Sequence, residues 1–591
     1  MDGPASLPSS KVFSMRLSPG FKFSFRGFSI VALIFLFLLP AWPKHDTDTK
    51  LTIHTELVLI PTLVTDKSGA HIRGLKQEDF TVEQNGKEQK LATFEEITSD
   101  TRRFSLPTNS AEFSNSFMGG PSAGRITLIV LDLINTRFSD QASARQELLK
   151  YLTESVDVRE PTGLYVLTRS GIQVIHDFTT DPQILVAALY QVNGDPDQMV
   201  DSPDDSAAGG SSSGSSPGQP HAAGGGKGAK SSAVHGEASK LQSVLGGGEL
   251  NFQSFEQRMA ITYTLEAMQQ VAQALLGFPG RKSLIWATGA FPFSVSDSMG
   301  IAPAGRDTLT DVLPLYERTW KLLNDAQIAL YPVDVKGLRT SLPGASRSGA
   351  PHGGAGKPPS NNRTFRQMDT QATFQTFASM TGGRAYFSSN DLVKGFHDAV
   401  DDSSTYYMLG YYLDRSDTKP GWQRLKVELK HGHGEVRARS GFFVTNSTSD
   451  PESSRSNDIS SALQSPLDFT SIPLSARWNN IEASQQQGKK HANYELRLPA
   501  DASLINATDN NHIVVDFVAL ARTPEGKQVD QPTGKKIDTH LTPQNLTAVQ
   551  QNGVIYRGFL ELSPGQYTVR FVVRDDLNGR TGSVEAPLRV E

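Results

Sequence analysis

The sequence contains no cysteine. This absence excludes disulfide scaffolds, thiolate zinc sites, iron–sulfur clusters and cysteine nucleophiles. It does not indicate a compartment, because a chain without thiols is compatible with oxidising and reducing surroundings. The sequence also has no excess of basic residues. It contains 57 Lys and Arg and 62 Asp and Glu, which gives a net charge of −5. This balance argues against a nucleic-acid-binding protein, which is usually basic.

One long apolar run lies near the N-terminus, where residues 28–39 read FSIVALIFLFLL. Four basic residues precede it, and the run is shorter than the roughly 20 residues that a membrane-spanning helix needs. A basic stretch followed by a short apolar run is typical of a secretory signal. We therefore expect residues 1–42 to be a signal peptide, with an uncleaved signal anchor as the alternative. The mature protein is expected to be exported, and to be periplasmic, displayed at the cell surface or secreted.

The 591 residues predict several domains. Residues 50–98 show short strands with turn signals at Asp66-Lys67-Ser68-Gly69 and Asn85-Gly86, which predict a small antiparallel β module. Strands then alternate with helical periodicity over residues 122–402, starting with the continuous apolar run 126–131. This pattern predicts an α/β domain with a mostly parallel central sheet and helices on both faces.

Two stretches inside this α/β region are rich in Gly, Ser and Pro. Residues 202–248 are predicted to be a disordered insertion and residues 342–361 a flexible loop, because such compositions bury too little apolar surface to offset the entropy of ordering.

The remainder of the chain has a β pattern. Residues 403–446 are expected to pair with the N-terminal β module, so that the α/β domain is inserted into one β unit. Residues 447–468 are predicted to be a polar linker, and residues 469–591 a β-sandwich. Strand alternation places Tyr407 and Tyr411 on one face of their strand and Tyr406 and Tyr412 on the other, with packing as their expected role.

A group of polar side chains follows the first strand of the α/β domain. Asp132 closes this strand, and Asn135 and Thr136 come directly after it. Ligands of open parallel sheets bind outside the carboxyl ends of the strands, and carboxylate, amide and hydroxyl oxygens suit Mg²⁺ or Ca²⁺. The alternative is a capping turn in which Asn135 or Thr136 binds backbone N–H groups at the start of a helix.

Several ordered motifs together resemble a von Willebrand factor A-type domain: TLIVLDLINTRFSD, GRKSLIWATGAF, IALYPVDVKGL, FASMTGGRAYF, YYMLGYYL and VRARSGFF. The resemblance is closer to the VWFA-related family described from acidobacterial proteomes. The segment VTDKSGAHIRGLKQEDFTVEQNGKEQKLATF is similar to the one that precedes the A domain in that family. The resemblance covers residues 51–444 and implies a Rossmann-like α/β fold with a metal-ion-dependent adhesion site.

The resemblance also implies which residues hold the ion. The family motif is Asp-x-Ser-x-Ser, joined by a Thr and an Asp from later loops. Asp132 matches the Asp and Thr136 the second Ser, whereas Ile134 stands where the first Ser is expected. Thr288 stands where the later Asp is expected, and no residue can be assigned to the middle Thr. We therefore expect a degenerate metal site of Asp132, Thr136 and Thr288 that binds Mg²⁺ or Ca²⁺ weakly or not at all.

Two further residues, Asn135 and Asp334, are expected to contribute to binding if they lie beside Asp132. The carboxylate of Asp132 is expected to face solvent at the rim of the sheet, beneath loops that hold another molecule. A parallel with phosphatases that use an Asp-x-Asp-x-Thr loop fails, because Ile134 cannot act as the general acid. His431 and His433 lie in a glycine-rich turn with no evident third metal ligand.

These observations predict that the protein is not an enzyme. We expect a binding or adhesion protein that recognises a protein or cell-surface ligand through the A-type domain. No nucleic-acid partner is expected, and membrane contact only through an N-terminal anchor. The alternatives are a non-catalytic structural protein or scaffold of the cell envelope and, less favoured by the sequence, a hydrolase that depends on Asp132.

Overall fold

The computed structural model describes most of the chain from Thr55 onward: residues 55–98, 112–116, 126–154, 161–192, 194, 234–295, 301–302, 312–336, 362–387, 392–414, 418–430, 434–445 and 451–591. The predicted signal segment 1–42, the predicted loop 342–361 and the histidines at 431 and 433 lie outside these ranges. Within the described residues, no helix is both long enough and apolar enough to cross a bilayer.

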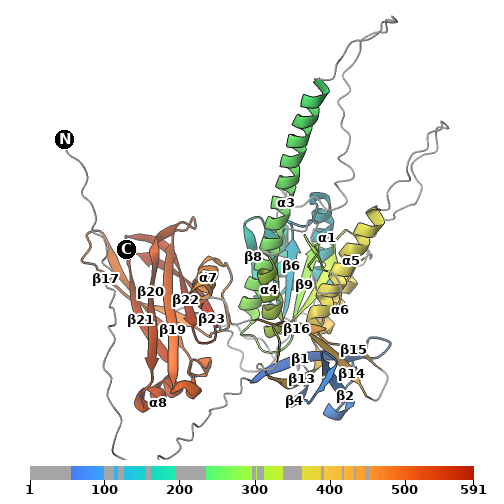
Figure 1. Cartoon of the computed structure of the whole chain (residues 1–591). Helices are drawn as coiled ribbons and strands as arrows, with labels where there is room; N and C mark the ends of the chain where they lie inside the picture. The colour runs from blue at the N-terminus through green and yellow to red at the C-terminus, as the bar shows by residue number, and fades with distance from the viewer. Residues whose placement is uncertain are drawn as a thin grey trace, which may run out of the picture. The chain divides into compact units, whose positions relative to one another are not determined.

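A five-stranded mixed sheet forms the centre of the α/β region, in the order β12-β9-β6-β7-β8 (Figure 1). The three pairs among β12, β9, β6 and β7 are parallel, and β8 adds an antiparallel edge. Every residue of β6 and β9 is buried, as expected of strands that are covered on both faces. The strands are β6 (Thr127–Asp132), β7 (Thr162–Thr168), β8 (Gly171–Thr179), β9 (Lys282–Thr288) and β12 (Ile328–Asp334).

Helices cover both faces of this sheet. Alternate residues of β6 point into two separate cores, with Leu128 and Val130 in one and Ile129 and Leu131 in the other. The first core is completed by α3 (Val234–Leu275), α4 (Leu313–Asp325) and α5 (Asn362–Thr381). The second is completed by α1 (Phe138–Glu154), α2 (Pro182–Gln191) and α6 (Leu392–Asp401). A two-stranded ribbon, β10 (Ser294–Val295) and β11 (Ile301–Ala302), follows β9.

The prediction of disorder for residues 202–248 is wrong at its C-terminal end. Helix α3 starts at Val234 and runs through the three glycines at 246–248, whereas residues 202–233 lie outside the described part of the chain. A helix that is anchored by a buried segment needs no further nucleation to extend, although each glycine in it costs about 1 kcal/mol relative to alanine. The buried segment here is residues 260–275, which pack against the sheet.

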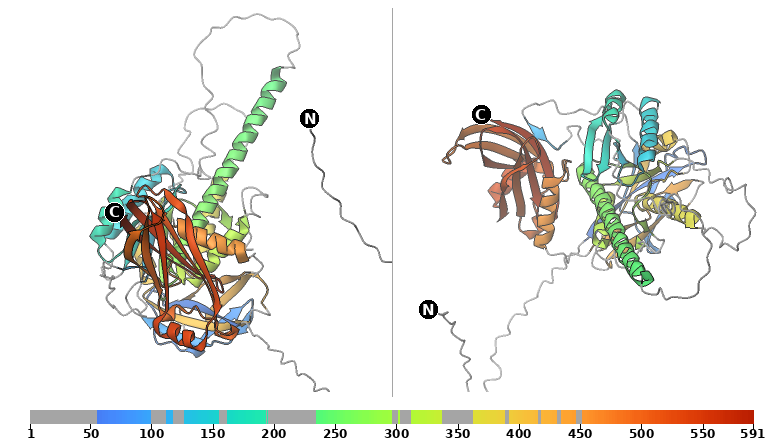
Figure 2. Two further views of the ribbon diagram at one scale, coloured as in Figure 1. Left: turned by 90° about the vertical axis from the view of Figure 1, so that its left-hand side faces the viewer. Right: turned by 90° about the horizontal axis from the view of Figure 1, so that it is seen from above.

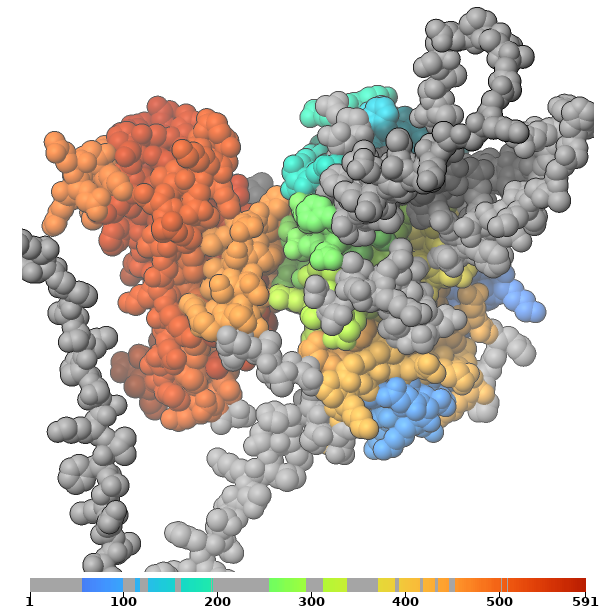
Figure 3. Space-filling view, turned by 45° about the horizontal axis from the view of Figure 1, so that its top comes forward, coloured from blue at the N-terminus to red at the C-terminus, as the bar shows by residue number. Residues whose placement is uncertain are grey.

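The strands on either side of the α/β region pair with each other. They form two antiparallel four-stranded sheets, β15-β1-β13-β4 and β16-β14-β2-β3. The expected pairing of the 403–446 segment with the N-terminal module is therefore present, and in Figure 3 the blue surface of that module borders the yellow and orange surface of the later strands. The elements are β1 (Thr55–Thr65), η1 (Gln77–Asp79), β2 (Phe80–Gln84), β3 (Lys87–Gln89), β4 (Thr93–Thr98), β13 (Thr405–Asp414), β14 (Gly421–Leu429), β15 (Glu435–Arg437) and β16 (Gly441–Val444).

The tyrosines of β13 alternate as expected. Tyr407 and Tyr411 are buried in the core between the two sheets. On the opposite face Tyr406 is also buried, and its hydroxyl accepts a hydrogen bond from the backbone N–H of Arg281 at 3.0 Å. Tyr412 on that face is 60% exposed.

Two antiparallel four-stranded sheets around one core make up the C-terminal β unit, residues 451–591 together with β5. Their orders are β21-β18-β17-β5 and β20-β19-β22-β23. The short blue strand β5 (Phe113–Ser114) lies at the edge of the orange and red strands in Figure 2. The other elements are β17 (Ser475–Ala483), β18 (Lys490–Leu498), η3 (Ala500–Ala502), η4 (Ala507–Asp509), β19 (His512–Arg522), β20 (Gln528–His540), α8 (Pro543–Asn552), β21 (Val554–Leu562), β22 (Gly565–Asp575) and β23 (Thr581–Val590).

The segment predicted to be a polar linker, residues 447–468, is mostly helix. Helix α7 (Pro451–Gln464) packs Ala462 and Leu463 against Phe469, Leu520 and Val572 of the C-terminal β unit. Ile459, Ala462 and Leu463 make a short apolar stripe at helical spacing that does not stand out in a Ser-rich sequence, so the partner surface identifies the helix.

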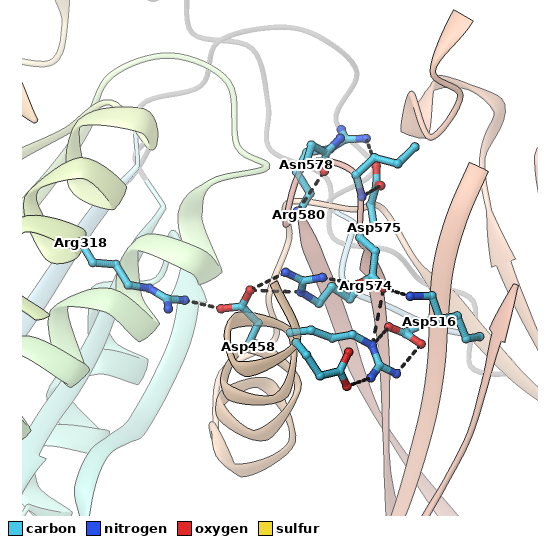
Figure 4. Close-up of polar contacts among 12 residues, drawn as sticks. Arg318, Asp458, Asp516, Arg574, Asp575, Asn578 and Arg580 are labelled. Atoms are coloured by element: carbon cyan, nitrogen blue, oxygen red, sulfur yellow. Dashed lines mark hydrogen bonds and ion pairs between the residues drawn. The ribbon is translucent and has the colours of Figure 1, made fainter. Parts of the chain in front are cut away.

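Hydrogen bonds and apolar packing join the C-terminal β unit to the α/β region. Asp458 of α7 accepts hydrogen bonds from Arg318 of α4 and from Arg574 of β22 (Figure 4). Beyond α7, Leu467 belongs to the core beneath α3, and Thr470 binds the end of α3 through its backbone and its hydroxyl. The chain therefore reaches the C-terminal unit through an ordered, packed junction.

Candidate functional site

The carboxylate of Asp132 is buried, with only 1% of the residue exposed. The expectation that it faces solvent at the rim of the sheet is therefore wrong. Asp132 ends β6, which is the middle strand of the sheet, between β9 and β7. Asn135, Thr136 and Thr288 around it are also buried, each at 3% exposure or less.

Five hydrogen bonds converge on this carboxylate. Oδ1 accepts from the backbone N–H and the Nδ2 of Asn135, at 3.1 and 3.0 Å. Oδ2 accepts from Asn135 Nδ2 at 2.8 Å, from Trp286 Nε1 at 3.0 Å and from Thr288 Oγ1 at 3.0 Å. Both oxygens are thus surrounded by N–H and O–H donors of the chain, an arrangement that we call the Asp132 network.

Two members of the Asp132 network were missed by the sequence analysis. Trp286 comes from the middle of β9, and Thr264 comes from α3. Thr264 is fully buried, accepts from Asn135 Nδ2 at 2.9 Å and donates to the carbonyl of Ala260 at 2.8 Å. The only signal in the sequence was a threonine among Ile261, Leu265 and Met268, which recur at helical spacing.

The side chain of Thr136 connects the loop after β6 to the residue that follows β9. Its Oγ1 accepts from the backbone N–H of Gly289 at 2.8 Å. A Cβ on Gly289 would lie 3.1 Å from the carbonyl oxygen of Asn135 and 3.3 Å from the Cα of Thr136, so the two chains approach closely here. These contacts do not form the capping turn that the sequence left open, because Thr136 Oγ1 accepts from Gly289 and Asn135 Oδ1 accepts no hydrogen bond.

Asp334 is not brought into the Asp132 network. It ends β12, where it pairs with Thr288 at the end of the adjacent strand β9, and its Oδ1 accepts from the backbone N–H of Lys336 at 3.0 Å. Since β9 lies between β12 and β6, Asp334 closes a strand two positions from that of Asp132. Of the five predicted residues, the structure gathers Asp132, Asn135, Thr136 and Thr288.

The gathered residues do not fit Mg²⁺ or Ca²⁺. Both ions need several oxygen lone pairs directed at one point. Here the lone pairs of Asp132 accept from donors of the chain, and Thr136 Oγ1 already accepts from Gly289. Asn135 turns its Nδ2 toward the carboxylate, and its Oδ1 is a buried atom without a hydrogen-bond partner. One orphan amide oxygen does not make a coordination set.

Burial raises the pKa of Asp132 to about 6, against the hydrogen bonds from Asn135, Trp286 and Thr288, which lower it. The folded protein then binds the proton more tightly than the unfolded chain does. The stability contributed by protonated Asp132 is present below about pH 4 and is lost as the pH rises through 6.

We expect this loss to be absent in Asp132→Asn, which does not titrate. Between pH 4 and pH 7, the free energy of unfolding of the wild type relative to the variant is expected to fall by on the order of 2–3 kcal/mol. Urea unfolding of both proteins at four pH values between these limits measures it. A difference that stays constant over the range contradicts the prediction.

An apolar depression lies beside the Asp132 network at the same end of the sheet. Its floor includes Leu131 and Leu133, and Phe138 at the start of α1 is 56% exposed at its edge. Arg145 closes one side, with its Nη1 donating to the carbonyl of Val192 at 2.8 Å. Among the described residues at the carboxyl end of β6, this depression is accessible and the carboxylate is not.

Comparison with protein-family models finds no match, and neither does comparison with curated proteins.

Proposed function

We propose that this chain is an exported, non-catalytic binding or scaffold protein built on a von Willebrand factor A-type domain. In this domain the Asp132 network takes the place of a metal ion. The motifs that resemble the family and the run of parallel strands support the domain type. The observation that carries the proposal is that both oxygens of Asp132 are satisfied by donors of the chain in a buried setting.

The Asp132 network has the layout of an adhesion site but the opposite polarity. An adhesion site offers oxygen lone pairs to a cation, whereas here N–H and O–H groups of Asn135, Trp286 and Thr288 point at the carboxylate. The side chain of Thr264 reaches the same group from α3, a role comparable to that of the middle Thr that the sequence could not place. Binding of a partner is then independent of divalent ions.

The recognition surface of this proposal is the apolar depression beside Phe138, which replaces the face near Asp132, Thr288 and Asp334 that the sequence suggested. Ligands of open sheets collect outside the carboxyl ends of the strands. An aromatic side chain that is more than half exposed beside buried leucines offers apolar area to a protein or cell-surface ligand.

Affinity capture from an envelope fraction with the immobilised full chain tests this function. We expect one retained partner whose recovery is the same with and without EDTA, and is reduced at least tenfold by Phe138→Asp. Tyr412→Asp is the matched control, because Tyr412 is an equally exposed aromatic residue on β13.

Capture that EDTA abolishes would contradict the metal-independent binding. Capture that both aspartate variants leave unchanged would contradict the surface. Turnover of phosphate or ester substrates that is lost in Asp132→Asn would contradict the non-catalytic assignment.

A further inference from the structure

Histidine and carboxylate side chains gather at one end of the β19–β20 pair in the C-terminal β unit. His512 is the first residue of β19 and His540 the last of β20, and the register places them directly opposite each other. Asp538 lies two residues before His540, and therefore on the same face of β20. Asp509 ends the short helix η4 that precedes β19.

The backbone turns Asp509 back over His512. Asn510 and Asn511 both adopt left-handed conformations, with φ of 49° and 57°, which asparagine tolerates better than most residues. His512 is held on the other side by two backbone hydrogen bonds with Asn506, at 2.9 and 3.2 Å. The short connection thereby brings a carboxylate against a histidine that the sheet already fixes.

Both ring nitrogens of His512 contact carboxylates. Nδ1 lies 3.0 Å from Asp509 Oδ2, and Nε2 lies 2.8 Å from Asp538 Oδ1. The His512 side chain is 17% exposed, and the ring of His540 stacks on it with centroids 4.3 Å apart. The hydrogen bonds to Asp538 and Asp509 raise the pKa of His512.

One ligand atom from each of Asp509, His512 and His540 lies within 4.8 Å of the other two. We propose that these three side chains bind a zinc ion. Two imidazole nitrogens and one carboxylate oxygen are a common protein set for zinc, which also accepts water in its fourth position.

The distances favour this assignment. Zinc bonds to nitrogen and oxygen measure about 2.0–2.2 Å, so two ligand atoms of a tetrahedral site lie roughly 3.3 Å apart. The 3.0 Å between His512 Nδ1 and Asp509 Oδ2 needs little change to admit the ion. Zinc bonds to the Nδ1 lone pair, so any proton carried by this nitrogen is released to solvent when the ion binds.

Asp538 completes the site without touching the ion. It keeps its hydrogen bond from Nε2–H of His512, which fixes the ring and directs the Nδ1 lone pair at the ion. His540 has to turn, because lone pairs lie in the ring plane and the two rings are parallel within 2°. As an exposed residue at the end of β20, it has room to rotate about its side-chain torsions.

Isothermal titration of the full chain with zinc chloride tests the proposal, on protein without an oligohistidine tag. We expect one equivalent to bind to this site, with an affinity that falls at least tenfold in His540→Ala and in Asp509→Asn. Asp538→Asn is expected to weaken binding by about tenfold, as loss of an outer hydrogen bond to a ligand histidine does. Zinc is also expected to raise the midpoint of thermal unfolding of the wild type and not of His540→Ala.

The chain contains thirteen histidines, so zinc binding by a histidine outside the proposed site has to be tested. His491→Ala is the matched control for this. His491 lies 2.7 Å from Glu561 and stacks on Phe559, so it offers the same histidine–carboxylate contact without a second histidine. Its removal is expected to leave zinc binding unchanged. No binding below millimolar zinc, or equal binding by wild type and His540→Ala, would overturn the proposal. His540 is exposed, so its replacement tests the site without disturbing the fold.

Discussion

Replacing Asp132 by leucine is expected to lower the free energy of unfolding by about 3 kcal/mol or more. Leucine accepts no hydrogen bond, so Trp286 Nε1 and the backbone N–H of Asn135 would be left buried and unsatisfied, whereas Asn135 Nδ2 would keep its hydrogen bond to Thr264. Each buried unsatisfied donor costs about 1–3 kcal/mol, which exceeds the gain from removing a desolvated carboxylate. Urea unfolding at neutral pH, followed by tryptophan fluorescence and by far-UV circular dichroism, measures the loss.

Asp66→Leu is the matched control for this experiment. The carboxylate of Asp66 also accepts from backbone N–H groups, those of Ser68 and Ala70, but in an exposed turn where water can replace it. Its loss is expected to cost less than about 1 kcal/mol. Equal effects of the two substitutions would show that the Asp132 network contributes no more than a surface turn does.

Replacing Gly277 by alanine is expected to detach the C-terminal β unit from the end of α3. The new Cβ would lie 2.1 Å from the carbonyl oxygen of Thr470 and 2.8 Å from its carbonyl carbon, and backbone atoms cannot move aside as a side chain can. Thr470 would also lose its contacts at this point. Its hydroxyl donates to the carbonyl of Ala274 at 2.8 Å and accepts from the N–H of Gly277 at 2.8 Å.

Gly277→Ala is expected to lower the free energy of unfolding by about 3 kcal/mol. This is the upper end of the range for overpacking, because hydrogen bonds are lost as well. Calorimetry is expected to show two transitions for the variant where the wild type shows one, and limited proteolysis to cut between α7 and the α/β region. Arg318→Ala is the comparison at the same junction. Arg318 is 42% exposed in its ion pair with Asp458, and such pairs contribute about 0–1 kcal/mol (Figure 4). A variant of Gly277 that unfolds like the wild type would contradict the proposed junction.

Hydrophobic periodicity and turn residues were sufficient to predict those strands and helices that a short stretch of sequence identifies by itself. The apolar run at 126–131 identified β6 because a strand covered on both faces has no polar positions. The pairing of the 403–446 segment with the N-terminal module was predicted from the β patterns on either side of the α/β region. The Asp132 loop was found by the same means, since strand ends are where polar side chains gather in a parallel sheet.

Periodicity and turn residues could not predict that Asp132 is buried. Its donors come from far along the chain, with Trp286 154 residues later and Thr264 129 residues after Asn135. The sequence around an Asp at a strand end does not distinguish a carboxylate exposed to solvent from one that is enclosed by hydrogen-bond donors of distant residues. The same limit explains α7, whose short apolar stripe has meaning only against Leu520 and Val572.

The sequence by itself determined the order of strands and helices, the two β regions around an α/β core and the loop that carries Asp132, because each of these depends on neighbours within a few residues. Only the tertiary structure decided that the carboxylate is enclosed by hydrogen-bond donors and that His512, His540 and Asp509 meet. Both depend on strand register and helix packing, which bring together side chains that no local pattern connects.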